Sequence, residues 1–449
     1  MKVHFIAIGG SAMHNLAIAL HQKGYEVSGS DDVIFEPSSS RLAKYGLLPA
    51  QEGWNIGNIK PDLDAVILGM HARIDNPELL KAQEMGLRIY SYPEYIYEQS
   101  KEKLRVVIGG SHGKTTITSM ILHVLNYHHK DFDYLVGAQL AGFETMVKVT
   151  ESAPIIIIEG DEYLASPIDR RPKFHLYRAN IAVISGIAWD HINVFPTFGE
   201  YISQFDKFIY TIFPNGKLIY CESDENLKQI VLNTKANIEK IPYLIPPNKI
   251  VDGETILLPN TPLEIFGNHN LLNLNAARLV CSELGISEEE FRDAIASFTG
   301  ASKRLELLNS VNDTNIYKDF AHSPSKLKAS VDAVKAQFKD RKLVACIELH
   351  TFSSLNSKFL DQYKNTMDKA DVRIIYIDEK TFRHKKMEPL TKDDIVEAFN
   401  DPDLVFFDDS NALETYLRNL DFRGTNLLLM SSGNFDGMDL IKLAYELNS

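Results

Sequence analysis

Strand-like and helix-like hydrophobic patterns alternate through the first hundred residues. Strand patterns occur at Val3–Ile8, Tyr25–Ser28 and Ala65–Leu68. Helical periodicity follows the first of them at Ala12–Gln22 and the last at Leu79–Met85. This alternation is typical of a parallel sheet covered by helices. The pattern predicts the α/β class and a Rossmann-like N-terminal domain over residues 1–100.

A second α/β unit is predicted to begin after the charged segment Gln99–Lys103. An apolar strand there leads through a glycine turn into a helix, and two further apolar strands follow. A more polar, proline-bearing stretch is predicted to add small strands and turns. We expect a central domain with a mostly parallel sheet over residues 101–299. Its predicted elements are the strands Leu104–Ile108, Pro154–Ile158 and Ile181–Ser185, the helix Thr115–Asn126, and the small strands of Asn215–Pro262.

The alternation resumes after a helical run over Leu271–Leu284 and the segment Gly300-Ala301-Ser302, which we interpret as a hinge. A third, Rossmann-like domain over residues 300–449 is the simplest account of this part. Its predicted elements are the helix Ser325–Phe338 and the strands Ile316–Tyr317, Leu343–Ile347, Arg373–Ile377, Leu404–Phe407 and Leu427–Met430.

Composition and charge restrict the classes of partner. The formal net charge is −13, and no basic stripe interrupts it. Nucleic-acid binding requires clustered lysine and arginine, so no nucleic acid is expected as a partner. The cysteines Cys221, Cys281 and Cys346 show no CxxC spacing, which argues against a disulfide framework or a zinc site.

The chain shows no targeting or membrane signal. Met1–Ile6 leads directly into a strand and a glycine turn. No apolar stretch approaches the roughly 20 residues that span a bilayer. We expect a cytoplasmic protein without membrane insertion.

A phosphate-binding loop is predicted between the strand Leu104–Ile108 and the following helix. Glycines let backbone N–H groups turn toward phosphates, the helix N-terminus adds positive potential, and a lysine supplies a mobile cation. The standard motif also requires a glycine where this chain has Ile108, so a tight turn with an incidental lysine is the alternative. The predicted ATP-binding residues of the loop are Gly110, Ser111, His112, Gly113, Lys114, Thr115 and Thr116.

The sequence Gly110-Ser111-His112-Gly113-Lys114-Thr115-Thr116 resembles the form that this loop takes in the Mur ligase family. Further motifs of that family follow in the same order and extend the resemblance over nearly the whole chain. They are Glu159-Gly160-Asp161-Glu162, Asp190-His191, Gly267-Asn268-His269-Asn270, Arg304 and Asp319-Phe320-Ala321-His322. The resemblance implies three α/β domains, of which the central one is a P-loop-type ATPase domain. It also implies an ATP-dependent ligase that forms carbon–nitrogen bonds.

The resemblance also implies a magnesium site. Thr115, Glu159 and His191 are its expected ligands, and Glu159 and His191 both follow predicted strands. A carboxylate, an imidazole, a hydroxyl and phosphate oxygens can complete a magnesium shell. Asp161 and Glu162 either repel one another or bind substrate. The carbamylated lysine of several relatives is not expected, because its offset falls on Asp206, beside Lys207.

Further nucleotide contacts are implied by the later motifs. Asn270 and Asn273 are expected to face the adenine, although Asn270 could instead cap a helix. Arg304 is expected to reach the phosphates, and Asp319 to meet the ribose or to order the site. The expected catalytic residues are Lys114, Glu159, His191, Arg304, Asp319 and His322.

The first domain is expected to bind the UDP-linked substrate. Its first turn resembles a dinucleotide fingerprint in which Ala7 and Ala12 replace two glycines, and a plain turn is the alternative. Asp31 is placed to meet a ribose hydroxyl. A later loop matches the family's substrate-facing loop. The expected UDP-substrate residues are Gly9, Gly10, Ser11, Ala12, Met13, Asp31, His71 and Arg73.

The resemblance covers two branches of the family that add different acceptors to the UDP-linked substrate. One branch adds L-alanine to UDP-N-acetylmuramate, and a recycling branch adds L-Ala-γ-D-Glu-meso-diaminopimelate. Residues 168–174 form a basic insertion typical of the tripeptide branch, and His350–Ser354 lacks two arginines of the L-alanine branch. Met430–Gly437 also resembles the tripeptide branch, which we therefore favour. His322 and His350 are expected to face the peptide.

Two rival hypotheses remain beside the tripeptide ligase. The first keeps the enzyme class and takes L-alanine as the acceptor. The second is a non-catalytic homologue that binds UDP-muramate, against which the intact Lys114, Thr115, Glu159 and His191 argue. The oligomeric state is left open.

Overall fold

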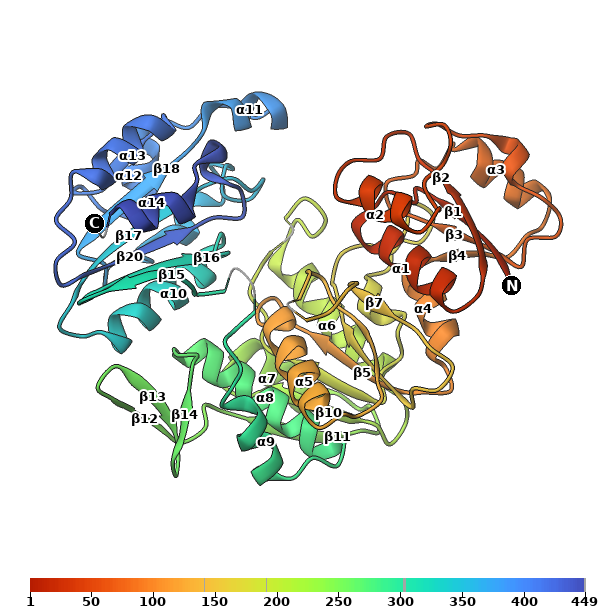
Figure 1. The fold of residues 1–449 in the computed structure, drawn as a ribbon, viewed down its shortest axis with the longest axis horizontal. Coiled ribbons are helices and arrows are strands. Elements are labelled where there is room, and N and C mark those ends of the chain that lie inside the picture. Colours follow the sequence, from red (N-terminus) through yellow and green to blue (C-terminus); the bar gives the residue numbers. More distant parts are fainter. Residues whose placement is uncertain (141, 191, 302–303, 448–449) are drawn as a thin grey trace. The chain divides into compact units, whose positions relative to one another are not determined.

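The computed structural model describes residues 1–140, 142–190, 192–301 and 304–447 (Figure 1). These residues form two compact units. The first contains Met1–Ile187, Gly199–Leu244 and Ala276–Phe291, and the second contains Ala188–Phe198, Ile245–Asn275 and Arg292–Ser449. The described helices include none that is both long and apolar enough to cross a membrane.

The first sheet is wholly parallel, in the order β2-β1-β3-β4. Every residue of β3 is buried, as expected for a strand covered on both faces. The α3 helix begins at the N-cap residue Asn76, whose side chain accepts hydrogen bonds from two backbone N–H groups. The elements are β1 (Lys2–Ile6), α1 (Ser11–Gln22), β2 (Glu26–Ser30), α2 (Ser38–Lys44), η1 (Ile56–Asn58), β3 (Ala65–Leu68), α3 (Pro77–Glu84), β4 (Ile89–Ser91) and α4 (Tyr92–Ser100).

The second sheet has the order β11-β10-β9-β5-β8-β6-β7 and is parallel except where β6 meets β7. Two of the strands expected to be small attachments, β10 and β11, belong to this large sheet. β10 is buried except for its first residue and pairs with β9, whereas β11 pairs with β10 and buries only Tyr243. The elements are β5 (Leu104–Gly109), α5 (Lys114–Tyr127), β6 (Asp133–Leu135), β7 (Val147–Lys148), β8 (Ile155–Glu159), η2 (Lys173–His175), β9 (Ile181–Ile184), α6 (Phe198–Thr211), β10 (Lys217–Cys221), α7 (Glu225–Asn233) and β11 (Glu239–Tyr243).

A small antiparallel sheet and two helices follow in the sequence. The sheet has the order β12-β13-β14. The elements are β12 (Asn248–Val251), β13 (Glu254–Leu257), β14 (Thr261–Leu263), α8 (Asn268–Glu283) and α9 (Glu288–Ile295).

The last sheet has the order β15-β16-β20-β17-β18-β19, and only β15 runs antiparallel. Alternate residues of β17 enter two separate cores, with α10 and α12 covering one face and α13 and α14 the other. The elements are β15 (Glu306–Val311), β16 (Thr314–Asp319), α10 (Pro324–Gln337), β17 (Lys342–Glu348), η3 (Leu360–Tyr363), β18 (Val372–Tyr376), α11 (Glu379–Lys385), α12 (Lys392–Phe399), β19 (Val405–Phe407), α13 (Ser410–Arg418), β20 (Thr425–Met430), η4 (Phe435–Gly437) and α14 (Leu440–Glu446).

Three sheets with mostly parallel strands thus lie within the three predicted domain ranges. The boundaries at residues 100 and 300 stay a prediction. The three cysteines are buried and free.

Candidate functional site

The position at which the standard phosphate-loop motif requires a glycine lies inside a strand. Ile108 is fully buried in β5 and pairs with Glu159 of β8 and Val183 of β9. The turn itself begins at Gly110, with φ +124°, and Gly113, with φ +76°, caps α5. Side-chain-bearing residues rarely adopt such angles. The two positions that need glycine are therefore glycine.

The other residues of the loop are attached to the end of β9. The Ser111 N–H donates to the Gly186 carbonyl at 3.0 Å, and the Ser185 hydroxyl donates to the His112 carbonyl. Thr116 is buried in the first turn of α5. These contacts hold the loop at the N-terminus of a helix, a position that stabilises a bound phosphate.

The ammonium group of Lys114 is hydrogen-bonded to oxygen atoms of the loop and of Glu162. Its Nζ donates to the Gly110 carbonyl at 2.7 Å and to Glu162 Oε2 at 2.6 Å. The Tyr201 hydroxyl donates to Glu162 Oε1 at 3.1 Å and lies 2.9 Å from Ser111 Oγ. Burial lowers the pKa of Lys114, but nearby carboxylates, Glu162 first, raise it to a net value above normal. The lysine is therefore charged and held beside its loop.

Asp161 and Glu162, left open by the sequence, each pair with a different lysine. Glu162 binds Lys114, whereas Asp161 accepts from Lys173 Nζ at 2.6 Å. Lys173 belongs to the basic insertion. The two acids are thus neutralised separately, and the pairing of Glu162 with the loop lysine was not foreseen. No sequence spacing signals it, because the two residues lie 48 positions apart.

Two of the three expected magnesium ligands lie together. Glu159 accepts from the Thr115 hydroxyl through Oε1 and from the Gly137 N–H through Oε2, both at 2.8 Å. Burial raises the pKa of Glu159, and the Gly137 N–H opposes that shift. A carboxylate and a hydroxyl beside a phosphate loop suit magnesium, which prefers oxygen ligands. His191 lies outside the described residues, among which no three acidic, histidine or cysteine side chains form a metal cluster.

The expected UDP-substrate residues gather at one edge of the first sheet. The turn from Gly9 to Met13 follows β1, Asp31 follows β2, and the loop with His71 and Arg73 follows β3. These strands are parallel and in register, so their carboxyl ends coincide. The first turn and α1 thus share an edge with the later loop.

The charged residues at this edge already have partners in the protein. Asp31 accepts from the Gly9 N–H at 2.7 Å, and burial raises the pKa of Asp31 to about 6 although that N–H opposes the shift. Arg73 is exposed and pairs with Asp75 at 2.9 Å, while His71 is exposed. Ser11 Oγ lies 3.8 Å from Met146 Sδ. Asp31 therefore braces the turn, a role that the sequence did not indicate.

Asn270 and Asn273 are buried on α8. Asn270 is the third residue of that helix, and its side-chain amide donates to the Phe266 carbonyl at 2.9 Å. It is therefore not the N-terminal cap.

Asp319 and Arg304 lie at the start of the last sheet, in the same compact unit. Asp319 accepts from the N–H groups of Leu305 and Ala321, each at 2.7 Å. Arg304 stacks on the Phe320 ring, 4.6 Å from its centroid. Asp319 thus orders the backbone beside Arg304.

His322 follows β16. Its Nδ1 donates to the Phe320 carbonyl at 2.7 Å, and Lys326 Nζ lies 3.4 Å from Nε2. Burial and the nearby Lys326 charge lower the pKa of His322 to about 3. The imidazole is neutral at neutral pH.

His350 and the segment Met430–Gly437 meet at the carboxyl edge of the last sheet, where β17 and β20 are neighbours. Buried Glu348 accepts from the Ser431 hydroxyl and from the Phe435 N–H, and His350 Nδ1 lies 3.7 Å from Glu348 Oε1. Among the described residues, the buried Ser323 Oγ, His350 Nδ1 and Ser432 Oγ have no hydrogen-bond partner. Unpaired buried polar atoms are uncommon in proteins, and a bound water, ion or ligand commonly satisfies them.

Relatives of known function cover nearly the whole chain. The model of the Mur ligase family catalytic domain matches residues 2–103, and that of the Mur ligase middle domain matches residues 108–281. The UDP-N-acetylmuramate–L-alanine ligase of Caldicellulosiruptor bescii is 31% identical over 411 residues, covering 87% of each chain. That of Lactiplantibacillus plantarum is 28% identical, covering 92% of this chain and 93% of that protein.

Solved structures share the fold. A murein peptide ligase from Psychrobacter arcticus superposes with a TM-score of 0.64 at 23% identity, covering 100% of this chain and 99% of that one. A UDP-N-acetylmuramate–alanine ligase from Thermotoga maritima gives 0.67 at 20% identity, covering 100% and 98%. The predicted α/β fold with three domains is thereby confirmed. The chain belongs to the Mur ligase family, ATP-dependent ligases that join UDP-linked muramic acid to amino acids or peptides.

Proposed function

We propose that this ligase joins the lactyl carboxylate of UDP-N-acetylmuramate to the amine of L-Ala-γ-D-Glu-meso-diaminopimelate, as a peptidoglycan recycling enzyme. One observation supports the choice of the tripeptide as acceptor: His350–Ser354 and Met430–Gly437 meet at the carboxyl edge of the last sheet. Met430–Gly437, which resembles the tripeptide branch, comes together there with His350–Ser354, which departs from the L-alanine branch, around Glu348 and unpaired buried polar atoms. The arginines of the L-alanine branch are absent from His350–Ser354.

The basic insertion over residues 168–174 also supports this choice. It folds back on itself, since the Ala165 N–H donates to the Arg171 carbonyl and the Lys173 N–H to the Tyr163 carbonyl. Its Lys173 side chain then reaches Asp161, next to the acid that holds Lys114. The insertion is therefore part of the surroundings of the phosphate loop.

The reaction has two steps. A carboxylate oxygen of the substrate attacks the γ-phosphorus of ATP and ADP leaves, which gives an acyl phosphate. The amine nitrogen of the peptide then attacks the acyl carbon, inorganic phosphate leaves, and the amine proton passes to a base. Lys114 stabilises the charge on the transferring phosphoryl group. The site must exclude water, because the acyl phosphate would otherwise hydrolyse. Ser302 of the predicted hinge lies outside the described residues.

The site residues take the following proposed roles. Thr115, Glu159 and His191 would hold Mg²⁺, which supplies Lewis-acid stabilisation of phosphate charge when bound. Asn270 and Asn273 would bind the adenine, and Arg304 with Asp319 the phosphates and ribose. The first-domain edge from Gly9 to Arg73 would bind the UDP moiety. His322 and His350 would face the incoming peptide.

L-alanine as the acceptor is the second candidate, because the relatives that are 28% and 31% identical are UDP-N-acetylmuramate–L-alanine ligases. One assay separates the two. The protein is incubated with ATP, magnesium and UDP-N-acetylmuramate, and ADP release is measured with L-alanine or with the tripeptide. We expect release with the tripeptide. Release with L-alanine alone would overturn the proposed acceptor.

The third possibility, a binding protein without catalysis, is tested by the same assay. ADP release with neither acceptor would favour it. The variant Lys114→Ala should reduce ADP release to background, because it removes the cation that faces the phosphates. The exposed Lys249→Ala serves as the matched control and should keep full activity.

A further inference from the structure

A cavity of about 650 Å³ lies at the carboxyl edge of the last sheet, beside α11. Ile377, which follows β18, and Asp408, which follows β19, both line it. Its wall includes the apolar side chains of Phe382, Met387 and Leu390. Cavities of this size at such an edge bind small molecules or amino-acid side chains.

Four charged residues, two of each sign, line this cavity. Arg383 and Lys392 are the cations, and Glu379 and Asp408 are the anions. In the described part of the chain none of the four forms an ion pair. Separate positive and negative groups beside an apolar wall suit a ligand that carries a carboxylate, an ammonium group and a hydrocarbon chain.

The helix α11 is basic in an otherwise acidic chain. Lys380, Arg383, His384 and Lys385 lie within Glu379–Lys385, whereas the whole chain has a formal charge of −13. A local positive potential of this kind attracts anionic ligands. Of these basic residues Arg383 lines the cavity, beside Glu379 of the same helix.

The same helix contacts both segments that we connect with the acceptor. Lys380 Nζ donates to Asp436 Oδ2 at 2.9 Å, which ties α11 to Met430–Gly437. Lys385 Nζ lies 4.4 Å from the centroid of the Phe352 ring, which ties it to His350–Ser354. Because β17 and β18 are adjacent, the cavity and these segments share one sheet edge. A peptide with its amine at His350 would extend toward α11.

We propose that this cavity is the subsite for the last residue of the incoming peptide, whose side chain ends in both an ammonium group and a carboxylate. This inference rests on the proposed function. Arg383 and Lys392 bind the carboxylate, Glu379 and Asp408 bind the ammonium group, and the apolar wall packs on the methylene chain. L-alanine has no group that reaches this far.

The test compares two tripeptides that differ only at the far end. L-Ala-γ-D-Glu-meso-diaminopimelate carries the distal carboxylate, and L-Ala-γ-D-Glu-L-Lys lacks it, while the attacking amine is the same. We expect the wild-type protein to use the first with a kcat/KM about 10-fold or more above the second. In Arg383→Ala the KM for the first peptide should rise about 10- to 100-fold, the effect of losing a charge-assisted hydrogen bond.

The variant should leave the KM for the lysine peptide, for ATP and for UDP-N-acetylmuramate unchanged. Arg383→Lys should give an intermediate KM for the diaminopimelate peptide, since it keeps the charge and loses the bidentate geometry. The exposed Arg423→Ala is the matched control for removal of a surface guanidinium. Thermal unfolding of each variant checks that the fold is retained.

The outcomes separate this inference from the proposed function. If the wild-type protein uses both tripeptides equally, or if Arg383→Ala affects both equally, the subsite is wrong and the tripeptide ligase stands. If the wild-type protein uses only L-alanine, the proposed function fails and the subsite fails with it.

Discussion

Individual side chains at the phosphate loop have partners that the motif does not predict. Lys114 and Thr115 follow from the motif, but their partners Glu162 and Glu159 come from another strand end, 48 and 44 positions away. Glu162 is nearly fully buried, so its charge depends on Lys114 for compensation. A bound phosphate would compete with Glu162 for the same lysine. Glu162 therefore acts as the counterion of Lys114 when nucleotide is absent.

Replacement of Glu162 by Gln should destabilise the nucleotide-free protein. The change leaves a buried lysine charge without its partner, at a cost of about 3 kcal/mol. Added ATP should restore stability, because its phosphates bind the lysine. Thermal unfolding with and without ATP measures both effects. An ATP-induced rise in Tm no larger in Glu162→Gln than in the wild type would contradict this role.

Protonation of His175 should lower the free energy of unfolding in acid. His175 stacks on Phe174 at 4.8 Å and donates to the Gln204 carbonyl at 2.8 Å. Burial lowers the pKa of His175 to about 4, although the Gln204 carbonyl opposes the shift. Since the folded-state pKa lies below the ordinary value, its stabilisation is complete above about pH 6.5 and is lost as the pH falls toward 4.

The variant His175→Gln keeps a hydrogen-bond donor and does not titrate. Its loss of unfolding free energy between pH 7 and pH 4.5 should be smaller than that of the wild type by about 2 kcal/mol, measured by urea denaturation. The exposed His384→Gln is the control and should follow the wild type. Parallel curves for wild type and His175→Gln would show that this histidine does not set the acid sensitivity.

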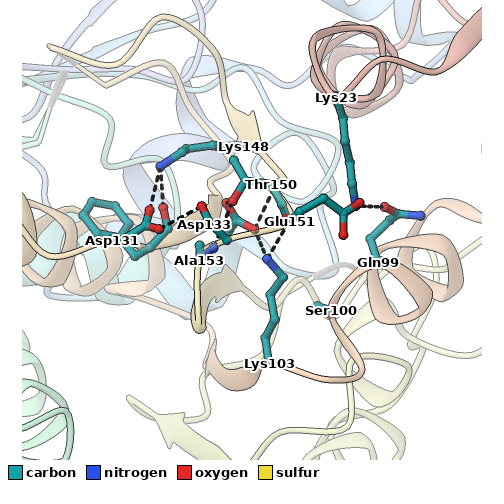
Figure 2. A network of polar contacts seen from close by, with 12 residues as sticks. Lys23, Gln99, Ser100, Lys103, Asp131, Asp133, Lys148, Thr150, Glu151 and Ala153 are labelled. Atoms are coloured by element: carbon teal, nitrogen blue, oxygen red, sulfur yellow. Dashed lines mark hydrogen bonds and ion pairs between the residues drawn. The ribbon is translucent and has the colours of Figure 1, made fainter.

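At the scale of elements, polar contacts join α1, the end of α4 and the second sheet, as Figure 2 shows. Lys103 Nζ donates to Asp133 Oδ2 at 2.6 Å and to the Thr150 carbonyl at 2.7 Å. Lys23, the C-cap residue of α1, pairs with Glu151 at 2.9 Å and donates to Gln99 at 2.8 Å. The segment between α4 and β5 is thereby held to the central sheet.

Lys103→Met should destabilise the protein by about 3 kcal/mol, because Asp133 is fully buried and would lose its cation. The double variant Lys103→Met/Asp133→Asn should recover part of this loss, since the introduced amide is neutral and its oxygen can still accept from Thr150. Urea denaturation gives the three free energies. The exposed pair Lys44–Glu144 supplies the control, and Lys44→Ala should change stability little. A similar loss in Lys44→Ala would refute the importance of burial.

At the scale of the whole molecule, predicted site residues in each sheet lie at or beyond the carboxyl ends of parallel strands. Gly9 and Asp31 follow β1 and β2, and His350 follows β17. Lys114 begins α5, after the loop that follows β5, and Glu159 is the last residue of β8. Parallel strands bring such residues to one edge, however far apart they lie in the sequence. The order of strands along each edge could not be predicted, because it depends on which apolar faces pack together. For the same reason β10 and β11 were not expected in the large sheet.

The sequence alone determined the fold class, the glycine turn between β5 and α5, and the family. These follow from local patterns: hydrophobic periodicity, glycines that permit left-handed backbone, and motifs in a given order. Tertiary structure decided which charges compensate one another, since ion pairs such as Lys114–Glu162 form between segments that only folding brings together. It also decided the cavity beside α11, whose walls are the ends of β18 and β19 and the residues between these two strands. Local sequence specifies backbone conformation, whereas burial and charge pairing depend on long-range packing.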